Sequence, residues 1–302
     1  MSDERKPAAI DVFEHGIEVT VRTLSPAGLT CLATRENDMV YSGYTVAILD
    51  GDGTSLNHRV AYLVSTPGPY QTSDLWDEND VRYCLRSALY HLNRIIDMYA
   101  RLCRLFDDLN SDSIRGNTSD DRIYFEVDSF FGDARRVYES MRKVLWRHYP
   151  TPGKSRWRGI RETMDDQSKI FPTDFATQLE QSWSRFGEKL TAYRDCISHY
   201  LPLTDNATCW MSRFDGRWGA TVPLPTNPET KSRAAFDNLN EGTGIDAMGY
   251  CYEVAVHLVG LCEDLMGLPA VEGHIVNPSP QNYPLRQKSD VDPNPRAARI
   301  NR

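Results

Sequence analysis

Hydrophobic residues recur every three or four positions over four long stretches of the chain. This spacing is typical of α-helices that bury one face. The stretches cover 81–109, 122–148, 171–203 and 245–266, and a shorter one lies near 157–167. Long amphipathic helices bury their apolar stripes most simply against one another. The pattern therefore predicts a bundle of about four or five helices.

The same spacing predicts which side chains point into the core. In the first stretch they are Leu85, Leu89, Leu92, Ile96, Tyr99, Leu102, Cys103 and Phe106. In the second they are Ile123, Val127, Phe130, Phe131, Ala134, Tyr138, Met141, Val144 and Leu145. In the third they are Phe175, Leu179, Trp183, Phe186, Leu190, Tyr193 and Ile197.

Strand patterns occupy two other parts of the chain. Residues 17–21 alternate with period two and 44–49 and 59–64 are β-rich, which predicts a small β-rich region over 1–75. Asp215-Gly216 stands between two aromatic-rich runs and predicts a β-hairpin at 208–222. The expected fold is mainly α, with the bundle and its hairpin over 76–270. The polar, Pro-rich stretch 271–302 is expected to be disordered.

Composition and charge limit the classes of function. A chain of 302 residues with 40% hydrophobic residues can bury a full core, and its net charge of −8 excludes nucleic-acid binding over the whole surface. The seven cysteines form no CxxC pair, which indicates reduced thiols and no metal or other cofactor. Neither a signal peptide nor an apolar run of membrane-spanning length occurs. We therefore expect a cytoplasmic protein with no membrane partner.

The end of the third helix carries the clearest candidate chemistry. Arg194, Asp195 and His199 follow one another there, and Pro202 predicts that the helix stops near His199. The spacing alone is uninformative, because Arg86 and His91 repeat it within the first helix. A helix end differs from a helix interior, since its unpaired backbone groups permit contact with a ligand. Arg142 to His148 is a second, slightly longer pair at a helix end.

The run Tyr-Arg-Asp-Cys-Ile-Ser-His-Tyr at 193–200, late in a predicted bundle, resembles the motif of HEPN domains. The resemblance implies a helical, often homodimeric protein. It also implies a metal-independent ribonuclease of toxin–antitoxin or phage-defence type, with RNA as ligand and an antitoxin or other protein as partner. Arg194 would hold the scissile phosphate, Asp195 would orient its neighbours, and His199 would act on the 2′-hydroxyl or the leaving oxygen. Tyr193 and Tyr200 would support them.

The β-rich N-terminal region and the hairpin are not part of a minimal HEPN domain. The proposed roles agree with elementary chemistry, because cleaving RNA through its own 2′-hydroxyl requires a base that titrates near neutral pH and a cation for the developing charge. In the alternative interpretation, Arg194 and Asp195 are solvated side chains and His199 only caps a helix.

A basic segment lies between the second and third long helices. It contains Arg142, Lys143, Arg147, Lys154, Arg156, Arg158 and Arg161, interleaved with Trp146, Tyr149 and Trp157. Cationic and stacking side chains together are typical of single-stranded RNA binding. The alternative is a solvated connector whose aromatic residues pack on the bundle.

Asp128 and Arg135 lie seven residues apart and therefore on one face of the second long helix. They either face the Arg194 site, as an acid and a second phosphate contact, or form a structural ion pair.

Two other functions have some support in the sequence. The segment 46–54 ends in Asp-Gly-Asp-Gly-Thr and resembles the nucleophile motif of haloacid-dehalogenase phosphatases. No succession of βα units follows to build that active site, so a turn is predicted there. The second alternative is a non-catalytic helical module that binds a partner protein or a nucleotide.

Overall fold

The computed structural model describes residues 17–19, 31–34, 45–48, 56, 59–60, 76–109, 115–153, 156–166, 169–199, 208–214, 217–225, 228–230 and 245–268. Its helices are α2 (Trp76–Asp108), α3 (Asp121–His148), α4 (Ile160–Asp165), α5 (Thr173–Ser182), a π-helical segment (Trp183–Gly187), α6 (Glu188–His199), a 3₁₀ turn (Pro228–Thr230) and α7 (Ala247–Met266). Its strands are β1 (Ile17–Val19), β2 (Cys31–Thr34), β3 (Thr45–Ile48), β4 (Arg115–Ser119), β5 (Thr208–Phe214), β6 (Arg217–Thr221), β7 (Pro223–Leu224) and β8 (Ile245–Asp246). The predicted mainly-α fold is confirmed.

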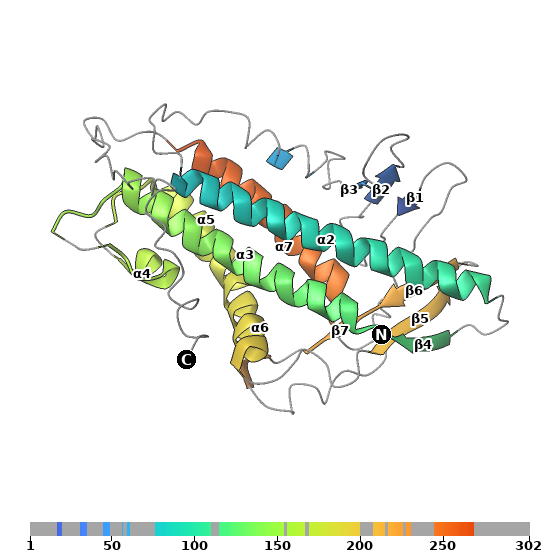
Figure 1. Ribbon diagram of the computed structural model, residues 1–302. Helices are drawn as coiled ribbons and strands as arrows, with labels where there is room; N and C mark the ends of the chain where they lie inside the picture. The colour runs from blue at the N-terminus through green and yellow to red at the C-terminus, as the bar shows by residue number, and fades with distance from the viewer. Residues whose placement is uncertain are drawn as a thin grey trace, which may run out of the picture.

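Three long helices form the centre of the molecule. Figure 1 shows α2 and α3 running antiparallel, with α7 alongside both. Every predicted inward position of α2 and α3 is buried except Phe106, which is partly buried and packs against the core. The six cysteines within the described residues are all buried. None of the described helices has a run long and apolar enough to cross a bilayer.

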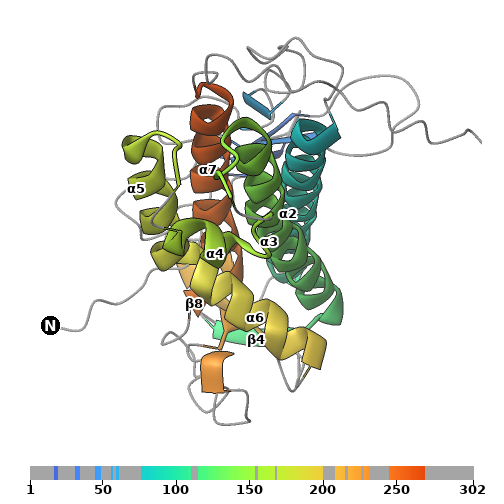
Figure 2. The ribbon, with the colours of Figure 1, turned by 90° about the vertical axis from the view of Figure 1, so that its left-hand side faces the viewer.

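The third predicted helix is interrupted. The π-helical segment divides it into α5, which packs against α7, and α6, which crosses α3 (Figure 2). A π turn inserts a residue into the α-helical repeat and changes which face of the following helix meets the core. Gly187 permits this geometry, because a Cβ there would overlap the ring of Trp183. Helix α6 ends at His199, as Pro202 predicts.

An antiparallel sheet covers one end of the bundle. Its order is β4–β5–β6, and it confirms the predicted hairpin; the turn at 215–216 lies outside the described residues. Residues 115–119, which lie between the first two predicted helices, form β4. These residues have no strand-like alternation of their own. They form a strand because they pair with β5, with Arg115 opposite Ser212 and Ser119 opposite Thr208. A short β7–β8 pair leads into α7.

The N-terminal β-rich region is confirmed in outline. Strands β1, β2 and β3 form an antiparallel sheet, of which β2 was not predicted. The predicted strand at 59–64 was wrong at its start, because Arg59 and Val60 are helical and Arg59 Nε donates to Glu263 Oε1 of α7 at 2.9 Å. Residues 50–54 and 271–302 lie outside the described residues.

Candidate functional site

A pocket of about 440 Å³ opens where α6 crosses α3. One stripe of α3 and one turn of α6 form its walls. The lining residues are Asp128, Gly132, Arg135, Arg136 and Glu139 of α3 and Arg194 and Ile197 of α6. The structure therefore brings Arg194 together with Asp128 and Arg135, three residues that the sequence separates by up to 66 positions.

Buried aromatic rings hold the two helices together behind this pocket. Phe131, the neighbour of Gly132, stacks on Tyr193, the neighbour of Arg194, with ring centroids 4.8 Å apart and planes 11° from parallel. The Tyr193 hydroxyl donates to the Pro225 carbonyl oxygen at 2.7 Å. Tyr193, which the HEPN resemblance places beside the site, is thus a core residue. Its role is to fix the position of α6, and with it the start of the Arg194 side chain.

The arginines of the pocket keep unused donors. Arg135 Nη2 pairs with Glu139 Oε1 at 2.8 Å, whereas its Nε and Nη1 atoms are buried without a hydrogen-bond partner among the described residues. Arg194 Nη2 lies 3.0 Å from Asp195 Oδ1, and its Nε is likewise buried with no partner in the described part of the chain. This ion pair joins two neighbouring residues of α6. Buried guanidinium N–H groups without partners are rare, and anionic oxygens are their best acceptors.

Asp128 is the pocket residue whose pKa is clearly shifted. Burial raises the pKa of its carboxyl from an ordinary value near 3.8 to about 7, and its Oδ1 has no hydrogen-bond partner within the described residues. The expected structural ion pair with Arg135 was wrong, because Arg135 pairs with Glu139, one turn further along α3. A carboxyl that titrates near neutral pH can both give and take a proton under working conditions.

This raised pKa makes a stability prediction for Asp128→Asn. In the unfolded chain the carboxyl ionises near pH 4, whereas in the folded protein it stays neutral up to about pH 7. As the pH rises from 5 to 8, the unfolded state therefore binds fewer protons at this carboxyl than the folded state does, and the contribution of Asp128 to stability falls. The amide of the variant does not titrate. The free energy of unfolding of the variant relative to the wild type should therefore rise by about 2 kcal/mol over that range. This is less than the pKa shift alone would give, because Asp128 is partly exposed.

Urea unfolding of both proteins at pH 5, 6, 7 and 8 measures this effect. The difference between variant and wild type cancels the groups that the two proteins share. A difference that stays constant with pH would show that Asp128 is ionised throughout.

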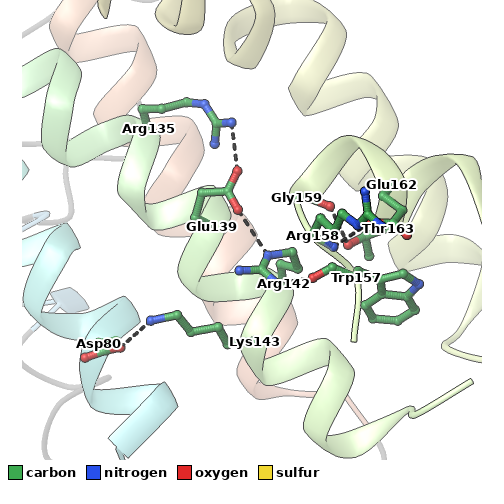
Figure 3. A network of polar contacts seen from close by, with 10 residues as sticks. All are labelled: Asp80, Arg135, Glu139, Arg142, Lys143, Trp157, Arg158, Gly159, Glu162 and Thr163. Carbon is green, nitrogen blue, oxygen red and sulfur yellow. Dashed lines mark hydrogen bonds and ion pairs between the residues drawn. The ribbon is translucent and has the colours of Figure 1, made fainter. Parts of the chain in front are cut away.

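The basic segment is only partly available to a ligand. Arg142 Nε donates to Glu139 at 3.1 Å and its Nη1 donates to the Trp157 carbonyl oxygen, while Lys143 pairs with Asp80 at 2.8 Å (Figure 3). Trp157 is 1% exposed, and its Nε1 donates to Asp166 Oδ2 at 2.8 Å. The prediction that the tryptophans of the basic segment are free to stack on RNA was wrong for Trp157. This ring packs in the core, against the partly buried Trp146.

Three arginines of the segment remain exposed, and one of them reaches toward the pocket. Arg156, Arg158 and Arg161 are exposed, and Arg147 is half-buried. The Arg161 guanidinium lies 5.7 Å from the centroid of the Trp183 ring, and that of Arg135 lies 4.8 Å from the same centroid. Trp183 is 4% exposed, so it is a fixed surface that both cations share. It connects the exposed end of the basic segment to the pocket wall.

Several predicted site residues cannot be placed in the pocket. Lys154, Tyr200 and the side chain of His199 lie outside the described part of the structure, although the backbone of His199 is the last residue of α6. Within the described residues, no group of three or more histidine, cysteine, aspartate or glutamate side chains could hold a metal ion. Sequence reasoning missed two residues of the pocket, Gly132 and Glu139. Helical spacing was the available signal, because Gly132 lies four residues after Asp128 and Glu139 lies four residues after Arg135.

Comparisons with known proteins add no relative. No family model matches the chain, and no curated protein or solved structure matches it either. The HEPN resemblance therefore rests on the residues at 193–200 and on the helical architecture.

Proposed function

We propose that the pocket between α3 and α6 binds a phosphate of the RNA backbone, in a HEPN-like protein that is a candidate metal-independent ribonuclease. One observation carries the proposal. Two guanidinium groups with unused donors, those of Arg194 and Arg135, share a pocket with the carboxyl of Asp128, which titrates near neutral pH. Phosphate binding and proton transfer can then take place in a single site.

Phosphate recognition follows from the arginines. Guanidinium groups present several donors in a fixed plane and bind phosphate oxygens with charge-assisted hydrogen bonds. Arg194, Arg135 and Arg136 outnumber the two acids of the pocket, and Glu139 is already paired with Arg135 and Arg142. A chain of net charge −8 can therefore still attract a polyanion at this place.

The cleavage step would use the ribose as its own nucleophile. A base removes the proton of the 2′-hydroxyl, whose oxygen attacks the phosphorus atom. The bond to the 5′-oxygen breaks, and an acid protonates that leaving oxygen, which yields a 2′,3′-cyclic phosphate and a 5′-hydroxyl. Arg194 would stabilise the charge on the phosphorane. Asp128 and His199 would serve as the acid and base, because an ordinary imidazole and the raised carboxyl both titrate near neutral pH.

The remaining contacts would come from the basic segment. Arg161, 64% exposed on the Trp183 ring, and its neighbours Arg156 and Arg158 would follow an RNA chain leaving the pocket. Homodimerisation would place two copies of the 193–200 motif around one cleft. The toxin or defence setting, with an antitoxin or other protein partner, rests on the HEPN resemblance.

The test is RNA cleavage in EDTA by the wild type, Arg194→Ala and His199→Ala. We expect the wild type to produce 2′,3′-cyclic ends and each variant to be slower by about 100-fold, which is the usual loss when a charge-stabilising donor is removed. Arg101→Ala removes an exposed arginine of α2 that pairs with Asp97, and it is the matched control. Equal cleavage by wild type, Arg194→Ala and His199→Ala would end the catalytic proposal.

A non-catalytic interaction module is the second candidate. Tyr83 and Tyr90 lie seven residues apart on α2 and are 64% and 58% exposed, and exposed aromatic residues on one helix face are typical of partner-binding surfaces. This function predicts binding of a partner protein or a nucleotide without RNA turnover, and binding that survives His199→Ala. Binding of a partner protein should be lost when Tyr83→Ala and Tyr90→Ala are combined.

A further inference from the structure

Gly132 lies in the middle of α3 without a structural reason for a glycine. A Cβ at this position would meet no atom of the described residues within 4 Å, and its backbone is ordinary α-helix. At Gly187 and Gly116, by contrast, the rings of Trp183 and Phe106 occupy the space that a Cβ would need. A glycine inside a helix lowers its stability relative to alanine. Neither packing nor backbone geometry therefore explains Gly132.

The place of Gly132 in the pocket supplies an explanation. It lines the wall four residues after Asp128 and four before Arg136, and Arg194 and Ile197 of α6 line the same pocket. Without a side chain, this part of α3 presents bare helix backbone to the pocket. A ligand can approach the helix there more closely than any other residue would allow.

The polar atoms around this bare surface define what could fill it. Arg135 Nε, Arg135 Nη1 and Arg194 Nε are donors and Asp128 Oδ1 is an acceptor, and all four are buried without a hydrogen-bond partner among the residues that the structure describes. Buried polar atoms are normally hydrogen-bonded, so a ligand that supplies these partners suits the pocket. The three donors suit phosphate oxygens, and the carboxyl suits an N–H or O–H group of the same ligand.

A nucleotide has this combination of groups. Its phosphate offers anionic oxygens, its base and ribose offer N–H and O–H donors, and its flat base can lie on an open surface. The pocket volume of about 440 Å³ is within the range of roughly 300–1,000 Å³ in which small ligands bind. Ile197 adds an apolar side chain opposite the bare backbone.

We propose that the pocket holds one whole nucleotide of the ligand, with its phosphate on Arg135 and Arg194 and its base or ribose on the backbone at Gly132, bonded to Asp128. Gly132 then determines the size of the unit that enters. This inference rests on the proposed function and extends it, because phosphate binding alone does not require Gly132.

The test measures the affinity of the protein for two kinds of probe by isothermal titration calorimetry at constant pH. One is inorganic phosphate, and the other is each of the four nucleoside 5′-monophosphates. The wild type should bind at least one nucleotide about tenfold more tightly than phosphate. Gly132→Leu, whose side chain would enter the pocket, should weaken nucleotide binding about tenfold or more and leave phosphate binding unchanged. Gly132→Ala should have a smaller effect of the same kind.

Loss of folding should not explain weaker binding by these variants. Both substitutions improve helix propensity and should keep or raise the melting temperature. Ser129→Leu adds the same side chain at an exposed position of α3 outside the pocket lining and is the matched control. Nucleotide binding that is equally tight in Gly132→Leu and wild type would overturn this inference alone. A wild type that binds neither phosphate nor any nucleotide would overturn the proposed function as well.

Discussion

Replacing Trp157 by alanine is expected to lower the free energy of unfolding by about 4 kcal/mol, the usual range for removing a fully buried tryptophan. Its indole ring is 1% exposed and packs edge-on against Trp146 and Phe171. The substitution also removes the Nε1 donor from the carboxyl of Asp166, which is buried. Urea unfolding measures the loss.

Two further variants separate the causes of this loss. Trp157→Phe keeps most of the apolar volume and removes the hydrogen bond to Asp166, so it should cost about 1–2 kcal/mol. Phe125→Ala truncates an aromatic ring that is 62% exposed on α3, and it should change stability by less than about 0.5 kcal/mol. If Trp157→Ala instead left stability unchanged and weakened RNA binding, Trp157 would be an RNA-stacking residue after all.

Asp246→Ala should destabilise the protein to a similar extent. Oδ1 of Asp246 accepts from the Tyr99 hydroxyl at 2.8 Å and from Val222 N at 3.0 Å, and Oδ2 accepts from Gly249 N at 2.9 Å as the N-cap of α7. One carboxyl thus joins α2, the sheet end and α7. Alanine removes the cap and leaves three donors without it, one of them on Tyr99, which is fully buried.

The expected loss is about 3 kcal/mol, since the lost cap at Gly249 costs roughly 1 kcal/mol and the donors of Tyr99 and Val222 without an acceptor cost roughly 1 kcal/mol each. This corresponds to a fall in melting temperature of about 10 °C. Asp264→Ala removes an exposed carboxyl from the same helix and should have little effect. A loss below about 1 kcal/mol in Asp246→Ala would show that water replaces the carboxyl at all three donors.

The helices and their buried faces could be predicted from the sequence because the signal is local and repeated. Residues such as Leu92 and Phe130 recur at helical spacing, and burial of one face follows from that spacing. Strand β4 could not be predicted in the same way. Its residues have no pattern of their own, and their hydrogen bonds come from β5, about 90 residues later in the chain.

Individual features of the candidate site could be predicted from the sequence, but not which of its residues lie together in the pocket. The helix end at His199 and the common face of Asp128 and Arg135 follow from Pro202 and from helical periodicity. Gly132 gives little signal of its own, because the meaning of a glycine in a helix depends on the space around it. The pairing of Arg135 with Glu139 depends on the directions of the two side chains on α3. The burial of Trp157 depends on neighbours from other elements.

The sequence by itself determined the class of the fold, the approximate extent of α2, α3 and α7, their buried stripes and the positions of the charged residues along them. Only the tertiary structure decided that Arg194 meets Arg135, Asp128 and the bare backbone of Gly132. The physical reason is the crossing of α6 over α3. It depends on the π-helical turn at Trp183–Gly187 and on the stacked rings of Phe131 and Tyr193, contacts between distant parts of the chain that no local pattern records.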